Sequence, residues 1–126
     1  MKNCDRGNAP AEFVLVSALL VSMVLGLLQV LMMGYVRHAL SAAAAEGARQ
    51  ASLLDLTESQ ALRVTQGLVT QSLSATYATD ISLARSSLLG TPTSEVVIVA
   101  PIPVLGVWSV GGSFRVVAHA PLERVP

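Results

Sequence analysis

Charged residues, cysteine and histidine are all scarce in this chain. Eight basic and eight acidic residues among 126 give a formal net charge of zero, so the sequence lacks the basic excess that marks nucleic-acid binding. The single cysteine, Cys4, excludes a disulfide within the chain, and no zinc-ligand spacing is present. We therefore expect no nucleic-acid partner, no metal site and no cofactor.

Catalytic patterns are missing as well. The sequence contains no H-E-x-x-H, G-x-S-x-G or phosphate-loop motif. His119 is expected on the polar face of a strand, beside Arg115 and Val117 and without a set of catalytic partners. We expect no catalytic residue, and hence a protein that is not an enzyme.

What the chain has in abundance is apolar sequence. Residues 13–36 carry no charge, and as a helix they would be about 36 Å long, enough to cross a hydrocarbon core of about 30 Å. A secretory signal peptide, with cleavage near Ala45 and Glu46 as the new first residue, is the alternative. Signal peptides usually have an apolar region of only about 7–15 residues. The length of the run therefore favours a membrane anchor.

The residues around and within the apolar run suggest its orientation and its contacts. Lys2 and Arg6 precede the run, which favours an N-terminus in the cytoplasm and a C-terminal part outside. Gln29 lies within the run, where its amide needs a partner helix or its own backbone. Small residues recur at helical spacing, a pattern that permits close packing of membrane helices but is also common in any membrane helix. This row consists of Ala18, Ser22, Gly26 and Gly34.

The sequence after the run predicts an α+β fold. The membrane helix continues into an alanine-rich segment, where a second small-residue row can face a neighbouring helix or the globular part of the chain itself. This row consists of Ala39, Ala43, Gly47 and Ala51. Thr57 and Gln60 predict a capping box that starts a second helix, which would end at about residues 75–77.

A small antiparallel sheet is expected to follow the two helices. Strand patterns cover residues 95–100 and 113–120, and Ile81 and Leu83 alternate in an earlier one. Turns are expected at residues 90–93 and 110–112. Helices that precede strands indicate an α+β domain whose helices cover one sheet face. The predicted division is a short leader at 1–7, an anchoring and assembly helix at 8–55, and a domain at 56–126.

The stretch GNAPAEF at residues 7–13 stands at the start of the apolar run. Glycine, four residues and then Glu-Phe resembles the processing site of type IV pilin-like proteins, and the text through Ala51 resembles the TadE-like minor pilins of the tight-adherence (Flp) pilus. The resemblance implies that a bacterial prepilin peptidase cuts between Gly7 and Asn8. Ala18 and Gln29 depart from the proline and the second glutamate that are common in that family.

The resemblance also implies a role for Glu12 and Phe13 in assembly. A carboxylate at the edge of hydrocarbon is costly unless it is paired, and the α-amine that cleavage creates on Asn8 of a neighbouring pilin is the implied partner. The simpler interpretation is that Glu12 only marks a helix start at the interface.

Three hypotheses about the whole chain remain open at this stage. The first is a minor pilin with other pilins as partners. The second is a membrane-anchored binding module, and the third is a secreted protein released near Ala45.

Overall fold

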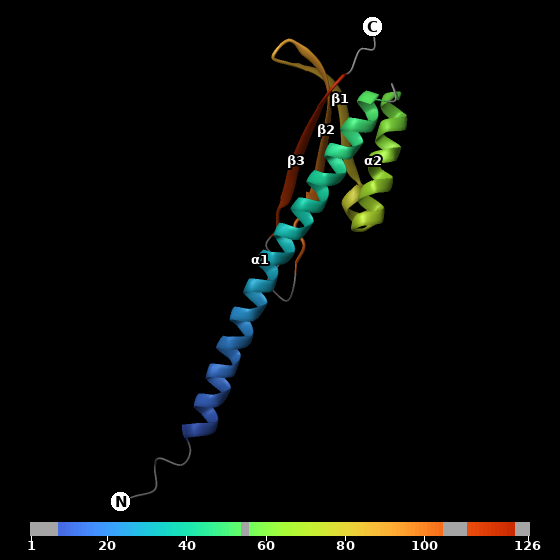
Figure 1. Cartoon of the computed structure of the whole chain (residues 1–126). Coiled ribbons are helices and arrows are strands. Elements are labelled where there is room, and N and C mark those ends of the chain that lie inside the picture. Colours follow the sequence, from blue (N-terminus) through green and yellow to red (C-terminus); the bar gives the residue numbers. More distant parts are fainter. Residues whose placement is uncertain (1–7, 54–55, 105–110, 123–126) are drawn as a thin grey trace, which may run out of the picture.

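The computed structural model describes residues 8–53, 56–104 and 111–122 (Figure 1). The predicted leader, and the start of the turn predicted at residues 110–112, lie outside these residues. Two helices, a short 3-10 helix and three strands follow one another along the chain, which confirms the α+β class. The elements are α1 (Asn8–Leu53), α2 (Glu58–Ser72), the 3-10 helix η1 (Ala75–Ala78), β1 (Asp80–Leu88), β2 (Thr91–Pro101) and β3 (Ser113–Pro121).

Helix α1 is one continuous rod of 46 residues, about 69 Å long. Its N-terminal half extends away from the rest of the molecule, and its C-terminal half packs against the sheet and α2 (Figure 1). The buried residues of α1 all lie in this second half. They are Val36, Leu40, Ala43, Ala44, Gly47, Ala48, Ala51 and Ser52. The expected continuation of the apolar helix into the alanine-rich segment is thus confirmed.

Helix α2 begins as predicted and ends earlier than predicted. The backbone N–H of Thr57 donates to Oε1 of Gln60 over 3.0 Å, which is the expected capping-box contact. The helix ends at Ser72, because Leu73 leaves the helical conformation, with φ −129° and ψ −93°, and turns its side chain toward the core. The residues predicted to complete the helix form η1 instead.

The sheet is an antiparallel meander in the order β1-β2-β3. Helix α1 contacts β2 and β3, and α2 contacts β1, so the two helices cover one face as expected. Alternate residues of the central strand point into this core, where Val96, Ile98 and Ala100 are at most 1% exposed. Their neighbours Leu83 and Val116 complete the buried layer from the two outer strands.

The turn predicted at residues 90–93 lies one residue earlier and is shorter. Leu88 pairs with Thr91, so only Leu89 and Gly90 connect β1 to β2, and residues 91–93 belong to β2. Both connecting residues have positive φ, 51° and 82°. This conformation matches the twist of a two-residue hairpin. The chain therefore reverses at Leu89 and Gly90, before Pro92.

Candidate functional site

The predicted processing and assembly residues lie at the free end of α1. Asn8 is the first residue of the helix, and Glu12 follows one helical turn later. Asn8, Glu12 and Phe13 are all exposed, with Phe13 74% exposed. Gly7 lies outside the described residues. The end of α1 that carries the cut-site pattern is therefore open to another protein.

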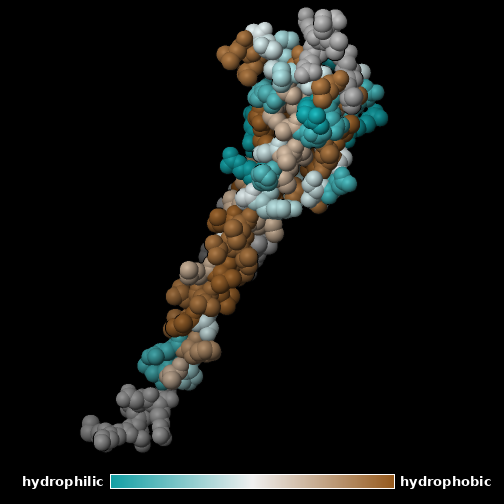
Figure 2. All heavy atoms as spheres, in the orientation of Figure 1, coloured by the Kyte–Doolittle hydropathy of each residue, from teal (hydrophilic) through white to brown (hydrophobic). Residues whose placement is uncertain are grey.

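A continuous apolar surface follows Glu12 along α1. Figure 2 shows it as a brown belt on the extended half of the helix, whereas hydrophilic residues gather over the domain. α1 is long and apolar enough to cross a membrane, with a mean hydropathy of 2.5 over its most apolar window, none of which is buried. The most exposed side chains in the belt include Phe13, Leu15, Leu19, Met23 and Val30. An apolar surface of this size needs a lipid or protein covering.

Gln29 is the polar residue within the apolar run whose amide was expected to bind either a partner helix or the chain's own backbone. Its Nε2 donates a hydrogen bond to the backbone carbonyl of Pro103, in the segment that follows β2. This segment runs beside α1 (Figure 1). The amide within the apolar run is thus satisfied by the chain's own backbone.

The family model of TadE-like proteins matches residues 7–49. The resemblance drawn from the cut-site pattern is therefore confirmed over this segment. No curated protein and no solved structure was found to match.

The TadE-like segment begins at Gly7 and covers most of α1. It includes the apolar belt and much of the packed half, and it excludes α2 and the sheet. Such a segment indicates involvement in a Tad pilus system, in which TadE-like proteins are typically structural.

The small-residue row in the apolar belt of α1 is exposed. Ala18, Ser22, Gly26 and Gly34 are all exposed. A Cβ atom placed on Gly26 or Gly34 would meet nothing within 4 Å. The Ser22 hydroxyl donates to the carbonyl of Leu19 over 2.8 Å and is satisfied within the helix. Packing of this row against another helix stays a prediction.

His119 has one side-chain neighbour that the sequence did not predict. His119 pairs with Glu95 across β2 and β3, and its Nε2 lies 3.4 Å from a carboxylate oxygen of Glu95. Sequence spacing alone could not align two residues from different strands. Within the described residues, no three histidine, cysteine, aspartate or glutamate side chains gather as a metal site would require. The contact is a cross-strand pair on the open face of the sheet.

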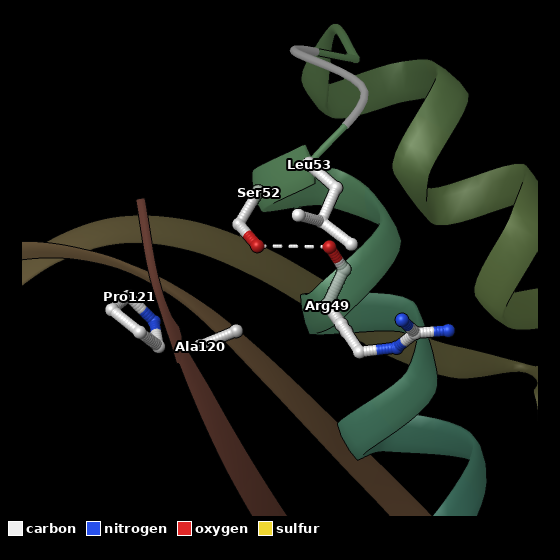
Figure 3. Close-up of a pocket in the computed structure, with 5 residues that line it drawn as sticks. All are labelled: Arg49, Ser52, Leu53, Ala120 and Pro121. Carbon is white, nitrogen blue, oxygen red and sulfur yellow. Dashed lines mark hydrogen bonds between the residues drawn. The ribbon is translucent and has the colours of Figure 1, made fainter. Parts of the chain in front are cut away.

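A shallow hollow lies between the C-terminal end of the TadE-like helix and β3. It is lined by Arg49, Ser52, Leu53, Ala120 and Pro121 (Figure 3). The Ser52 hydroxyl donates to the carbonyl of Arg49 over 2.8 Å.

The Arg49 guanidinium points away from Ala120 and Pro121 (Figure 3) and pairs with Glu46 at 3.0 Å. Hydrogen bonds from Arg49 and then Gln50 hold the pKa of the Glu46 carboxyl below its ordinary value of 4.5. Arg49 and Glu46 thus form an ion pair with each other. Neither is arranged with the other residues that line the hollow as a catalytic group would be.

Proposed function

We propose that this chain is a minor pilin of a Tad/Flp-type pilus, with a role in assembly, priming or adhesion. The observation that carries the proposal is the Gly7-to-Phe13 pattern, which directly precedes an exposed apolar helix within a TadE-like segment. The exposed belt supports a role in which the same helix first sits in lipid and then packs against other subunits.

Processing is the first step of the proposed function. A prepilin peptidase removes residues 1–7 and leaves Asn8 as the new N-terminus. Asn8 already stands at the start of α1, so the new α-amine lies at the end of the helix. Pro10 suits this first turn, because the first helical N–H groups have no intrahelical acceptor.

Glu12 is the proposed assembly residue. A carboxylate at the edge of hydrocarbon is stabilised by a nearby positive charge. The amine on Asn8 of a neighbouring subunit supplies this charge as the helices bundle. Phe13 and the row Ala18, Ser22, Gly26 and Gly34 then face the helices of other pilins.

Before assembly, the protein is held in the bacterial cytoplasmic membrane by one pass of α1. The basic leader residues Lys2 and Arg6 favour an N-terminus in the cytoplasm. The domain built on α2 and the sheet then lies outside.

The mature N-terminus tests the proposal directly. Protein isolated from its native membrane, analysed by N-terminal sequencing and intact mass, should begin at Asn8. An intact leader would contradict processing and favour an anchored binding module. A start at Glu46 would instead identify a secreted protein.

Substitution of Glu12 tests the assembly step separately. Glu12→Ala should still be cleaved after Gly7, but its amount in sheared pili should fall on the order of tenfold, because a lost charge pair in a dry site is worth at least about 1.4 kcal/mol. Glu58→Ala, which removes an exposed acid at the start of α2, is the matched control and should assemble normally. Normal incorporation of Glu12→Ala would contradict the pairing.

A further inference from the structure

The segment that follows β2 meets α1 on its apolar surface and not on the buried face of the domain. Pro103 accepts the hydrogen bond from Gln29, seven residues before Val36, where the buried face of α1 begins. Seven residues correspond to about 10 Å along the helix. The end of β2 and the residues after it therefore extend below the domain, toward the part of α1 that is expected to lie in lipid.

The backbone of this segment is suited to an environment without water. Pro101 and Pro103 have no N–H group, and the N–H of Ile102 donates to the carbonyl of Gly112 over 3.1 Å. The carbonyl of Pro103 accepts from Gln29. Each N–H group of residues 101–103 is thus either absent or paired, which is what hydrocarbon requires of backbone donors.

The side chains of this part of the chain are equally free of charge. No charged residue occurs between Glu95 and Arg115 in the sequence. Val104 ends the described part of this segment and is 43% exposed. An exposed valine at this level of α1 continues the apolar belt onto the domain.

The length of the span places the segment at a membrane boundary. This step rests on the proposed single-pass anchoring of α1. If hydrocarbon begins just after Glu12, about 20 residues bring its outer edge to about Met32. Gln29 then lies about 5 Å inside that edge, where an unpaired amide would be costly. Pro103, which accepts the hydrogen bond from Gln29, lies at the same depth.

We propose that residues 101–104 form a membrane-contact segment that rests in the outer boundary between headgroups and acyl chains. The partner is the lipid of the same bilayer that α1 spans. The Gln29 amide holds the segment against the helix at that depth. The domain thereby contacts the membrane surface through residues 101–104 as well as being joined to α1.

A second copy of the chain could cover an apolar patch of this kind. Lipid is favoured, because the segment is continuous with the belt on α1 and the N–H groups of residues 101–103 are already absent or paired. A protein partner that accepted hydrogen bonds from this backbone would need free N–H groups, which residues 101–103 do not offer.

Depth-dependent fluorescence quenching tests the proposal. The full-length chain with Cys4→Ser carries a single environment-sensitive label on Val104→Cys and is placed in phosphatidylcholine/phosphatidylglycerol vesicles. Some vesicles contain lipids with a nitroxide quencher near the headgroup, and others contain it at mid-chain. With the headgroup nitroxide, the label at position 104 should be quenched at least about twofold more than the same label on Val117→Cys. The reason is that interfacial residues lie about 5–10 Å into the boundary.

Val117 is a matched control, because it is a valine of nearly equal exposure, 41%, on the outer face of β3. Leu20→Cys reports the span itself and should be quenched most by the mid-chain nitroxide. If Leu20 is quenched but Val104 responds like Val117, the contact segment is wrong and the anchoring stands. If Leu20 is not quenched, both are wrong. Crosslinking of Val104→Cys to a second copy without lipid quenching would replace lipid by protein as the partner.

Discussion

At the scale of single residues, Leu89 adopts a backbone conformation that is sterically unfavourable for leucine. It is fully exposed and has φ 51°, in the left-handed region where a side chain with a Cβ is strained. The conformation is imposed by the two-residue connection between β1 and β2. Its side chain gains nothing from burial in return.

Replacing Leu89 by asparagine should therefore stabilise the hairpin. Asn-Gly is the preferred pair for a turn with two positive φ values, so Leu89→Asn should raise the free energy of unfolding by about 0.5–1 kcal/mol. Urea unfolding in detergent micelles measures the change. Leu88→Asn, in β1 and 50% exposed, is the control and should not stabilise. An equal gain in both variants would contradict the conformational explanation.

At the scale of elements, α1 carries two small-residue rows with different outcomes. In the first row, in the apolar belt, a Cβ atom on Gly26 or Gly34 would meet no described atom within 4 Å. The second contains Gly47, which lies against Thr65 of α2. Thr65 is fully buried, and its hydroxyl donates to the carbonyl of Ala61 over 2.9 Å. The same four-residue spacing thus serves packing within the chain in one half of the helix and leaves an open surface in the other.

The contact between α1 and α2 predicts a large effect at Gly47. A Cβ atom there would clash with Oγ1 of Thr65 and lie 3.1 Å from its Cβ. Rotating Oγ1 away would break its hydrogen bond to the carbonyl of Ala61 and would leave the Cβ contact in place. Despite the higher helix propensity of alanine, Gly47→Ala should lower the free energy of unfolding by about 1–3 kcal/mol.

Gly67→Ala is the control for helix propensity, because a Cβ atom at Gly67 meets nothing within 4 Å. It should stabilise α2 by about 0.5–1 kcal/mol. Thr65→Ala combined with Gly47→Ala should recover part of the loss in urea unfolding. If Gly47→Ala behaved like Gly67→Ala, the close contact of the helices would be wrong.

At the scale of the whole molecule, one helix joins two environments. Its first half presents apolar side chains on all sides, and its second half buries one face under the sheet and α2. The boundary falls near Val36, directly before Arg37, the first charge after Glu12. The proposed anchoring and the packing of the domain therefore use different parts of a single element.

Charges placed in the apolar half should release the protein from membranes. Leu20→Arg with Leu27→Arg adds about 5–7 kcal/mol to insertion, at about 2.5–3.5 kcal/mol for each arginine near the helix centre. The variant should leave the membrane pellet on carbonate washing. Leu53→Arg with Leu88→Arg, both at positions 50% exposed, should stay in the pellet. Retention of the first variant would contradict the assigned span.

The sequence determined the features that depend on local chemistry. The apolar run, the capping box at Thr57, the alternation in β3 and the TadE-like pattern around Glu12 all follow from neighbouring residues. The α+β class follows from the order of these periodicities. The predicted membrane orientation and the cut after Gly7 rest on the same local signals and await the measurements described above.

The tertiary structure decided which distant residues meet. Helix α2 ends early because Leu73 leaves the helical conformation and packs against the core. The turn after β1 lies at Leu89 and Gly90 because the pairing of Leu88 with Thr91 fixes the register. Glu95 meets His119 for the same reason, and Gln29 finds Pro103 across 74 positions of the chain. Spacing along a sequence fixes the face on which a residue lies, whereas its partner depends on how separate elements pack. Packing is a property of the whole fold.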